Sequence, residues 1–341
     1  MGHLLALVLQ TGLPRNGGKN LKAGVSVIIV TFNSARHIAA CLGPLGQADE
    51  VVVVDNASSD GTCEIVAREA TKIKLIRNAS NRGFAAAVNQ GIEATSSPFV
   101  LLLNPDTVLR SSLQPLVERC LVPQAGAACG ELVDGKGQAQ IGFNFRSFPT
   151  PAALLFEVLL INRLWPSNPV NRRYRCLDAD PDTSREVDQP AGAFLMLRRD
   201  VLRQVGGLDE NFHPIWFEDV DLCLRVRKAG HVIHYDPRCV AEHTGGHSVG
   251  RISVEERYRA WYGNLLRFSR KHFSKGTRRW LYIAVRVGLR LRWLLCVLGA
   301  GTASERMACQ NVIKTLGGFS FHDRNVAAGL GTASPAESKS S

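Results

Sequence analysis

Apolar, β-branched runs alternate with helix-like stretches from residue 25 onward, and no other feature of the sequence restricts the fold as much. The runs read "VSVIIVTF", "EVVVVDN", "IKLIRN" and "PFVLLLNPD". Strands with so few polar residues are buried on both faces, as happens where helices cover both sides of a parallel sheet. The sequence therefore predicts an α/β fold over residues 24–250, with a mostly parallel central sheet flanked by helices, doubly wound at least in its first half.

The other regions have a different character. Between about 135 and 190 the periodicity fails, and Pro, Asn, Arg and Asp accumulate around one predicted helix, "AALLFEVLLI"; long excursions of this kind are often substrate loops or lids. Residues 251–316 are expected to form basic helices. Residues 1–23 lack the basic start and cleavage site of a signal peptide and are expected to be a disordered leader, and 317–341 a disordered tail.

Charge is distributed unevenly along the chain. The net charge is +11, yet residues 1–250 hold 25 basic and 25 acidic side chains, whereas residues 251–300 hold 12 basic and 2 acidic ones. A nucleic-acid-binding protein would need basic side chains interleaved with aromatic ones on its ordered fold, and the neutral first 250 residues argue against one. The nine cysteines show neither a CxxC pair nor the spacing of His/Cys metal ligands, which indicates free thiols in a reducing compartment.

Polar residues follow three of the predicted strands. They are the triplet Thr31, Phe32 and Asn33, the pair Asp55 and Asn56, and the triplet Asn104, Pro105 and Asp106. A single polar strand end is merely the start of a loop, but ligands of open parallel sheets bind outside the carboxyl ends of the strands. Three such ends at one edge therefore indicate a binding site.

A nicotinamide-dependent dehydrogenase would also carry an acid near the position of Asp55. Its first turn would be rich in glycine, so that a pyrophosphate can reach the start of a helix. Here that turn reads "VTFNSARH" and contains no glycine, which argues against a dehydrogenase.

Three acids, Glu218, Asp219 and Asp221, stand within four positions at the start of a predicted helix. Acids in the first turn interact favourably with the positive end of the helix dipole, each by roughly 0.3–1 kcal/mol. The cluster also has the composition of a catalytic site. The local pattern alone leaves both interpretations open.

Six segments occur in order between residues 24 and 250: "VSVIIVTFNSARHI", "VVVVDNASSDGT", "NRGFAAAVNQGI", "LLLNPDT", "AGAFLMLRRDVLRQVGGLDENF" and "FEDVDLCLRVRKAGHVIHY". In this order they resemble the inverting family 2 glycosyltransferases of the GT-A fold, above all bacterial dTDP-rhamnose-dependent rhamnosyltransferases. The resemblance implies transfer of a sugar, rhamnose first, from a nucleoside-diphosphate donor to a polyprenyl-linked or other glycan acceptor in cell-envelope synthesis. The alternatives are another UDP- or dTDP-hexose, and a non-catalytic sugar-nucleotide-binding relative, which the presence of both Asp106 and Asp219 disfavours.

The resemblance also implies roles for the acids. Asp219 matches the aspartate that deprotonates the acceptor hydroxyl, and Glu218 would orient this base or hold the acceptor. A general base has to be ionised and within hydrogen-bond reach of its proton, and a first-turn position favours both. Asp221 is expected to be structural.

The remaining roles concern the sugar donor and a metal ion. The resemblance implies Thr31, Phe32, Asn33, Asp55, Asn56, Gly83, Asn89, Asn104 and Asp106 as donor-binding residues. Asp55 would accept a hydrogen bond from the N–H of the pyrimidine ring, and Gly83 would let the backbone approach the ligand; alternatively, Asn89 caps or solvates its helix.

Asn104 replaces the first acid of the family's metal motif. Mg²⁺ or Mn²⁺ would therefore bind Asp106, diphosphate oxygens and water. His243 matches the family's metal-contacting histidine and suits Mn²⁺ somewhat better; His247 is the rival candidate, and either could be a loop histidine with a local hydrogen bond.

The segment "RRWLYIAVRVGLRLRWLLCVLGAGT", residues 278–302, is too often interrupted by charge to span a membrane. On a helical wheel Arg279, Arg286 and Arg290 form one stripe, with Leu281, Ala284, Leu291 and Leu295 on the opposite side. This pattern predicts an amphipathic helix in the interface of an anionic membrane, at the cytoplasmic side of the cell membrane. The alternative is a helix that packs on the rest of the protein or mediates oligomers.

Overall fold

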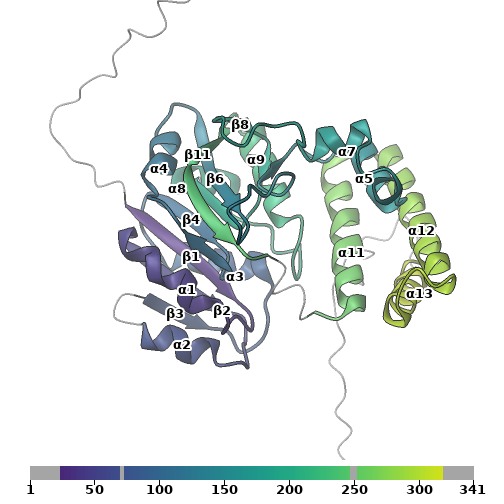
Figure 1. Cartoon of the computed structure of the whole chain (residues 1–341), viewed down its shortest axis with the longest axis horizontal. Helices are drawn as coiled ribbons and strands as arrows, with labels where there is room; N and C mark the ends of the chain where they lie inside the picture. The colour runs from purple at the N-terminus through teal and green to yellow at the C-terminus, as the bar shows by residue number, and fades with distance from the viewer. Residues whose placement is uncertain (1–23, 70–72, 246–251, 318–341) are drawn as a thin grey trace, which may run out of the picture.

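The computed structural model describes residues 24–69, 73–245 and 252–317, so the predicted leader and almost all of the predicted tail lie outside it. Figure 1 shows a sheet with helices on both sides, and a second group of helices beside it that includes the C-terminal part of the chain. The first half of the chain forms β1 (Val25–Thr31), α1 (Ile38–Leu42), the 3-10 helix η1 (Gly43–Gln47), β2 (Glu50–Asp55), α2 (Thr62–Arg68), β3 (Ile73–Arg77), α3 (Phe84–Glu93), β4 (Phe99–Leu103), β5 (Thr107–Leu109), α4 (Gln114–Cys120) and β6 (Ala125–Val133). The second half forms β7 (Phe145–Arg146), α5 (Pro151–Val158), α6 (Ile161–Leu164), α7 (Pro169–Tyr174), β8 (Arg185–Val187), β9 (Gln189–Pro190), β10 (Phe194–Arg198), α8 (Arg199–Val205), α9 (Glu218–Lys228), β11 (Val232–His243), α11 (Val254–His272), α12 (Lys275–Val297) and α13 (Ala303–Gly317).

The main sheet has the strand order β3-β2-β1-β4-β10-β6-β11-β5, and β8 also pairs with β11. β1 lies parallel between β2 and β4, with Thr31 opposite Asp55 and Ile29 opposite Leu103. β10 runs antiparallel between β4 and β6, and β5 and β8 run antiparallel to β11. The register brings the polar ends of β1, β2 and β4 to one edge of the sheet.

Side chains along β1 alternate between the two faces of the sheet. Val27 and Ile29 join one apolar core with residues of α1, α2 and α4, whereas Ile28 and Val30 join another with residues of α3, α8 and α9. Both faces are buried, which explains why the strands contain so few polar residues. The predicted α/β fold with a mostly parallel central sheet is confirmed, and all nine cysteines are free thiols as predicted.

The segment 135–190 contains more structure than the sequence predicts. Instead of one helix it forms α5, α6 and α7, together with the two-stranded ribbon of β7 and β9. Thr150 caps α5 by accepting a hydrogen bond from Ala153 N, and Asn168 caps α7 by accepting one from Asn171 N. α6 and α7 are only 4 and 6 residues long, too short to show helical periodicity in the sequence.

The C-terminal region forms the helices α11, α12 and α13. Ser253 forms a capping box with Glu256 at the start of α11, and Ser274 caps α12 by accepting a hydrogen bond from Thr277 N. The three helices share a third apolar core with α5 and with residues around the start of α9. They are therefore packed against the earlier part of the chain.

The prediction that Leu281 and Ala284 face a membrane is wrong, because both are buried in this third core. The exposed apolar residues of α12 lie on another side of the helix, and they are Trp280, Ile283, Val287, Leu291, Leu294 and Val297. A helix with two apolar sides gives no signal in the sequence that tells which side is buried. In the described ranges, no helix combines the length and apolar character that crossing a bilayer requires.

Candidate active site

A cavity of about 630 Å³ lies at the edge of the sheet where β1, β2 and β4 end. Phe32, Asn56 and Asn104 line it from these strand ends, and the start of α9 lines another side. Residues of the segment 135–190 and of α11 complete the wall. The volume is in the range of about 300–1,000 Å³ that is typical of small-molecule sites.

Asp106 and His243 form a buried pair in the wall of this cavity, with 3.6 Å between Oδ1 of Asp106 and Nε2 of His243. Gln140 fixes the imidazole. Its amide N–H₂ donates to the His243 carbonyl over 2.7 Å, and its carbonyl oxygen lies 3.0 Å from Nδ1. Nδ1 therefore carries the ring proton, and Nε2 directs its lone pair toward the Asp106 carboxylate.

This pair fits a divalent cation. Burial lowers the pKa of His243, which favours the neutral imidazole that can act as a ligand. A lone pair and a carboxylate that face each other are stabilised by a cation between them. Among the residues that the structure describes, no group of three or more His, Cys, Asp or Glu side chains is placed to hold a metal, so further ligands would come from substrate and water. His247, the rival candidate, lies outside the described residues.

Glu218 and Asp219 are the first two residues of α9, and both line the cavity. The Asp219 carboxylate accepts hydrogen bonds from the backbone N–H groups of Val220, over 2.8 Å, and of Gly192, over 3.2 Å. Glu218 is buried, and its Oε2 has no hydrogen-bond partner among the described residues. The positive end of the α9 dipole favours a negative charge at this position.

The two carboxyl groups differ in how firmly they hold a proton. Burial, and then the charge of Asp219, raise the pKa of Glu218 well above its usual value. Burial also raises the pKa of Asp219, but backbone N–H groups and the Arg146 guanidinium stabilise its charged form. Of the two, Glu218 therefore holds its proton more firmly, and Asp219 is the one that ionises more readily. A carboxyl group whose pKa is raised toward the working pH is suited to act as a general base.

A strained turn precedes α9. Trp216 and Phe217 both have left-handed backbone conformations, with φ of 79° and 73°, which cost roughly 1–2 kcal/mol each. The side chain of Asn264 in α11 donates hydrogen bonds to two carbonyls of this turn, His213 O over 3.2 Å and Ile215 O over 2.9 Å. α11 thereby holds the turn that orients the acidic pair.

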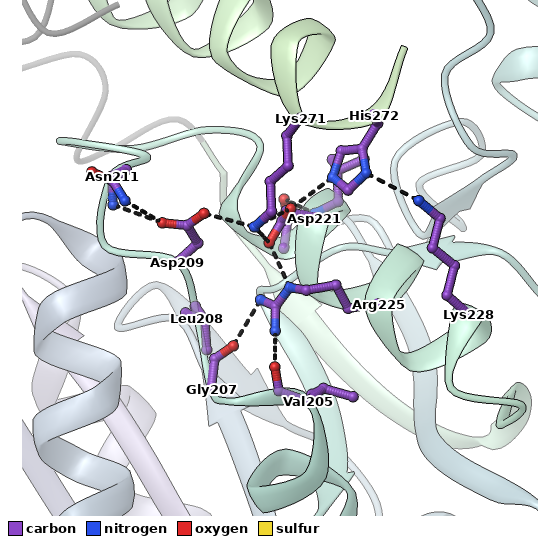
Figure 2. A network of polar contacts seen from close by, with 12 residues as sticks. Val205, Gly207, Leu208, Asp209, Asn211, Asp221, Arg225, Lys228, Lys271 and His272 are labelled. Atoms are coloured by element: carbon purple, nitrogen blue, oxygen red, sulfur yellow. Dashed lines mark hydrogen bonds and ion pairs between the residues drawn. The ribbon is translucent and has the colours of Figure 1, made fainter. Parts of the chain in front are cut away.

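Asp221, the third acid of the cluster, does not line the cavity. Figure 2 shows it at the centre of a network of basic side chains. The carboxylate is fully buried and lies 2.7 Å from Arg225 Nε, 2.8 Å from Lys271 Nζ and 2.7 Å from His272 Nε2. Lys271 and His272 belong to the end of α11, so this network joins α9 to α11.

The residues expected to bind the sugar donor fall into two groups. Phe32, Asn56, Asn104 and Asp106 line the cavity, whereas Thr31, Asn33, Asp55, Gly83 and Asn89 do not. Thr31 Oγ1 donates to the Asp55 carboxylate over 2.7 Å, and Ser58 donates to it from both its N–H and its hydroxyl. Asp55 is thus buried under the strand-end residues, and its contact with a pyrimidine ring stays a prediction.

Asn33, Gly83 and Asn89 have structural partners. Asn33 takes a left-handed conformation and accepts a hydrogen bond from Ser59 N over 2.8 Å. A Cβ on Gly83 would lie 2.6 Å from His213 Nδ1, so the glycine permits the close approach of another loop. Asn89 bonds with both ends of its amide to the backbone of Leu208, a distant segment and not its own helix, and its contact with a sugar donor stays a prediction.

Many cavity residues were not found by sequence reasoning, among them Gln140, Arg146, Gln189 and Trp261. The first three belong to the irregular segment 135–190, where no motif marks them. Trp261 lies within α11, where the sequence pattern predicts that an aromatic residue belongs to the apolar core. The only signal was the length and the Arg-rich composition of the irregular segment.

Two carboxyl groups at a helix start and a buried Asp–His pair share one cavity at the edge of the sheet where β1, β2 and β4 end. The family model described as Glycosyl transferase family 2 matches residues 26–206, more than half of the chain, and the protein belongs to this family. The predicted GT-A type of fold is thereby confirmed.

Several known proteins are similar to this chain. The N-acetylglucosaminyl-diphospho-decaprenol L-rhamnosyltransferase of Mycobacterium tuberculosis is 28% identical over 274 residues, which cover 71% of this chain and 88% of that protein. The low-salt glycan biosynthesis hexosyltransferase Agl10 of Haloferax volcanii is 24% identical over 269 residues, 77% of this chain and 81% of that protein. Among solved structures, the mannosyltransferase PcManGT of Pyrobaculum calidifontis, in complex with GDP-Man and Mn²⁺, is 18% identical with a TM-score of 0.48, covering 90% of this chain and 84% of that one.

Proposed function

We propose that this glycosyltransferase inverts the anomeric configuration of the sugar by direct displacement. Asp219 removes the proton of an acceptor hydroxyl, and the oxygen attacks the anomeric carbon as the bond to the nucleoside diphosphate breaks. A single displacement needs a base and no enzyme nucleophile. The observation that supports this most is the placement of Asp219 in the cavity wall, with its carboxylate held by two backbone N–H groups beside the weaker acid Glu218.

We propose Mg²⁺ or Mn²⁺ as the cofactor, held by Asp106 and His243. When bound, the cation neutralises charge on the departing diphosphate. Because Asn104 stands where a second acid could be, the protein offers one carboxylate and one imidazole, and the imidazole favours Mn²⁺. Gln140 holds the imidazole with Nε2 toward this position.

The proposed sugar donor is dTDP-rhamnose. The "NPD" motif of residues 104–106 and the similarity to the mycobacterial rhamnosyltransferase support it. Another UDP- or dTDP-hexose is the alternative, since a second relative is a hexosyltransferase. The proposed acceptor is a glycan joined through a diphosphate to a polyprenyl lipid, of the kind that the mycobacterial relative's name states, in cell-envelope glycan synthesis.

We propose that α12 places the protein at the cytoplasmic face of the cell membrane. Its exposed residues Trp280, Ile283 and Val287 begin an apolar stripe with helical spacing, and the exposed Arg279 and Arg290 lie on the same helix. Burial of the apolar side chains in the membrane favours binding, and each basic residue near an anionic surface adds roughly 1 kcal/mol. α12 packs on α5, and residues of α5 also line the cavity wall. Only α5 therefore separates α12 from the cavity.

A screen of sugar donors tests the proposed reaction. Purified protein is incubated with dTDP-rhamnose, other dTDP-hexoses or UDP-hexoses, a prenyl-diphosphate glycan, and Mn²⁺ or Mg²⁺. We expect release of nucleoside diphosphate, fastest with dTDP-rhamnose, and a product of inverted configuration by NMR. A product of retained configuration would contradict direct displacement, and full activity in EDTA would contradict the metal proposal.

A further inference from the structure

Arg146 is a positively charged residue of the cavity wall, and the proposed reaction leaves it without a ligand. It lies on β7 opposite Gln189 of β9, and both side chains line the cavity. Its Nε donates to the Gly142 carbonyl over 2.7 Å, which fixes the guanidinium. In the ranges that the structure describes, no carboxylate forms an ion pair with it, whereas nearby Arg175 pairs with Glu157 at 3.8 Å. The outer nitrogens of Arg146 are therefore available to a ligand.

Two buried polar atoms of the same cavity have no hydrogen-bond partner among the described residues. They are Oε1 of Gln189, a residue 5% exposed, and Oε2 of Glu218, a residue 4% exposed. Buried polar atoms in proteins are almost always satisfied, so a pair of such atoms in a cavity wall points to a ligand. Gln189 Oε1 can only accept a hydrogen bond, and a neutral Glu218 can also donate one. The hydroxyl groups of a sugar supply both kinds of partner.

Aromatic and apolar side chains line the neighbouring wall. Leu154, Trp216 and Trp261 belong to it, and so does Tyr174, whose ring centre lies 5.9 Å from the guanidinium carbon of Arg146. The cavity thus combines partners for hydroxyl groups, a cation for an anion and apolar surface for a hydrocarbon chain. A sugar joined to a lipid through phosphate has these three parts.

We propose that Arg146 binds the phosphate groups that join the acceptor sugar to its lipid, while Gln189 accepts a hydrogen bond from a hydroxyl of that sugar. This inference deepens the proposed function and rests on it. A planar guanidinium can bind two phosphate oxygens at once. The diphosphate of the sugar donor is the other anion of the reaction, but the ribbon that carries Arg146 continues into Gly192, whose N–H bonds to Asp219. Arg146 therefore belongs to the side of the base, where the acceptor binds.

Calorimetric titration of the full chain with geranyl diphosphate, a soluble short prenyl diphosphate, tests this assignment. EDTA is present, so that no cation holds the probe at Asp106 and His243. We expect Arg146→Gln to weaken binding about ten-fold or more, and to change binding of uncharged geraniol by less than about two-fold. Arg146→Lys keeps the charge without the planar fork and should fall between. Arg203→Gln, on the exposed side of α8, is the matched control and should bind like the wild type.

A second titration contains saturating dTDP and Mn²⁺, and we expect geranyl diphosphate still to bind. Competition with dTDP would place the probe in the sugar-donor site and overturn the proposal. Equal weakening of geraniol and geranyl diphosphate in Arg146→Gln would also overturn it, because Arg146 would then shape the cavity instead of binding an anion. Unchanged binding of geranyl diphosphate in that variant would do the same. These titrations do not depend on sugar transfer, so their failure is distinct from a failure of the donor screen.

Discussion

Several groups stabilise the charged form of the buried Asp219 carboxyl and so offset part of the effect of burial on its pKa. The N–H groups of Val220 and Gly192 bond to it, and Arg146 contributes a positive potential. A Cβ at Gly192 would lie 3.3 Å from the Asp219 Cβ, a tight contact that the glycine avoids. Backbone and side chains thus set both the position and the protonation of this one carboxyl group.

Replacing Asp219 by Asn tests its role as the base. The amide keeps the size of the side chain but cannot take a proton, so turnover should fall about 10²-fold or more. Binding of the sugar nucleotide, measured by calorimetry, should stay near the wild-type value. Turnover close to that of the wild type would remove Asp219 from this role.

The pH dependence of the reaction follows from the same carboxyl. Because burial raises the pKa of Asp219, the base is protonated and lost at a higher pH than an ordinary aspartate with a pKa of 3.8. Activity should therefore decline as pH falls through this raised pKa, at a higher pH than an ordinary aspartate would give. A profile of kcat/KM against pH measures it, and a limb at or below 3.8 would contradict the assignment.

Gln140 orients the imidazole of His243, because both ends of its amide bond to that residue. Its amide holds the imidazole with Nε2 toward Asp106, so Gln140→Leu should free the ring to rotate. We expect metal affinity to fall about 10–100-fold, as is usual when a residue that orients a ligand is lost. Titration of Mn²⁺ in the presence of dTDP measures it, and Asp106→Ala should lower the affinity further. An unchanged affinity in both variants would contradict a metal site here.

At the scale of elements, the contact between α9 and α11 determines whether the acidic pair is in place. α9 begins after a strained turn, and α11 holds this turn through Asn264 and the body of α9 through Lys271 and His272 (Figure 2). The family model ends at residue 206, before both helices. The position of the acidic pair Glu218 and Asp219 therefore depends on helices that lie outside the region matched by the family model.

The Asp221 network gives a prediction for stability. Its basic partners lower the pKa of Asp221 to about 2, from an ordinary value of 3.8. A lowered pKa in the folded state stabilises the fold above the unfolded value, and this stabilisation is lost as pH falls from about 4 to about 2. Asp221→Asn removes the carboxylate that Arg225, Lys271 and His272 share, and Lys271 alone keeps a second carboxylate partner among the described residues, Asp209. The change should cost about 3–5 kcal/mol of unfolding free energy. Urea denaturation measures it.

The matched control for this variant is Asp178→Asn. Asp178 pairs with Arg172 on the surface, with side chains 64% and 48% exposed, so its loss should cost less than about 1 kcal/mol. Similar losses in the two variants would mean that the contact between α9 and α11 is not held by this network.

At the scale of the whole molecule, three apolar cores are arranged in series, two on the faces of the sheet and one among the C-terminal helices. The third core includes Leu154 and Val158 of α5, and a Cβ on Gly288 of α12 would lie 1.9 Å from Val158 O. Removing α12 and α13 would expose this core. Membrane binding is therefore better tested by surface substitutions than by truncation.

A pair of serines on the exposed stripe, Ile283→Ser with Leu294→Ser, should abolish flotation with anionic vesicles. The wild type should float with vesicles rich in phosphatidylglycerol, less with neutral ones, and be released by high salt. Leu121→Ser replaces a leucine that is 63% exposed after α4, far from α12 in sequence, and should float like the wild type. Equal behaviour of the three proteins would contradict the membrane proposal without affecting the chemistry.

The sequence allowed prediction of those features that repeat locally or follow a motif. Runs of β-branched residues identified the strands, because burial on both faces excludes polar residues from every position. Asp106, Glu218, Asp219 and His243 were found because they belong to motifs, and the structure brings them to one cavity. Asp55 and Asn89 belong to motifs as well, yet their hydrogen bonds in the structure link segments of the protein to each other, Asp55 to Thr31 and Asn89 to Leu208.

By itself, the sequence determined the α/β fold, the edge of the sheet that carries the site and the acids around it, since these depend on periodicity and on short-range order along the chain. Only the tertiary structure decided which side of α12 is buried, that Asp221 joins α9 to α11, and that Arg146 and Gln189 enter the cavity. The reason is physical: each of these depends on contacts between segments more than 40 residues apart, and neither hydrophobic periodicity nor local charge encodes which distant partner a side chain meets.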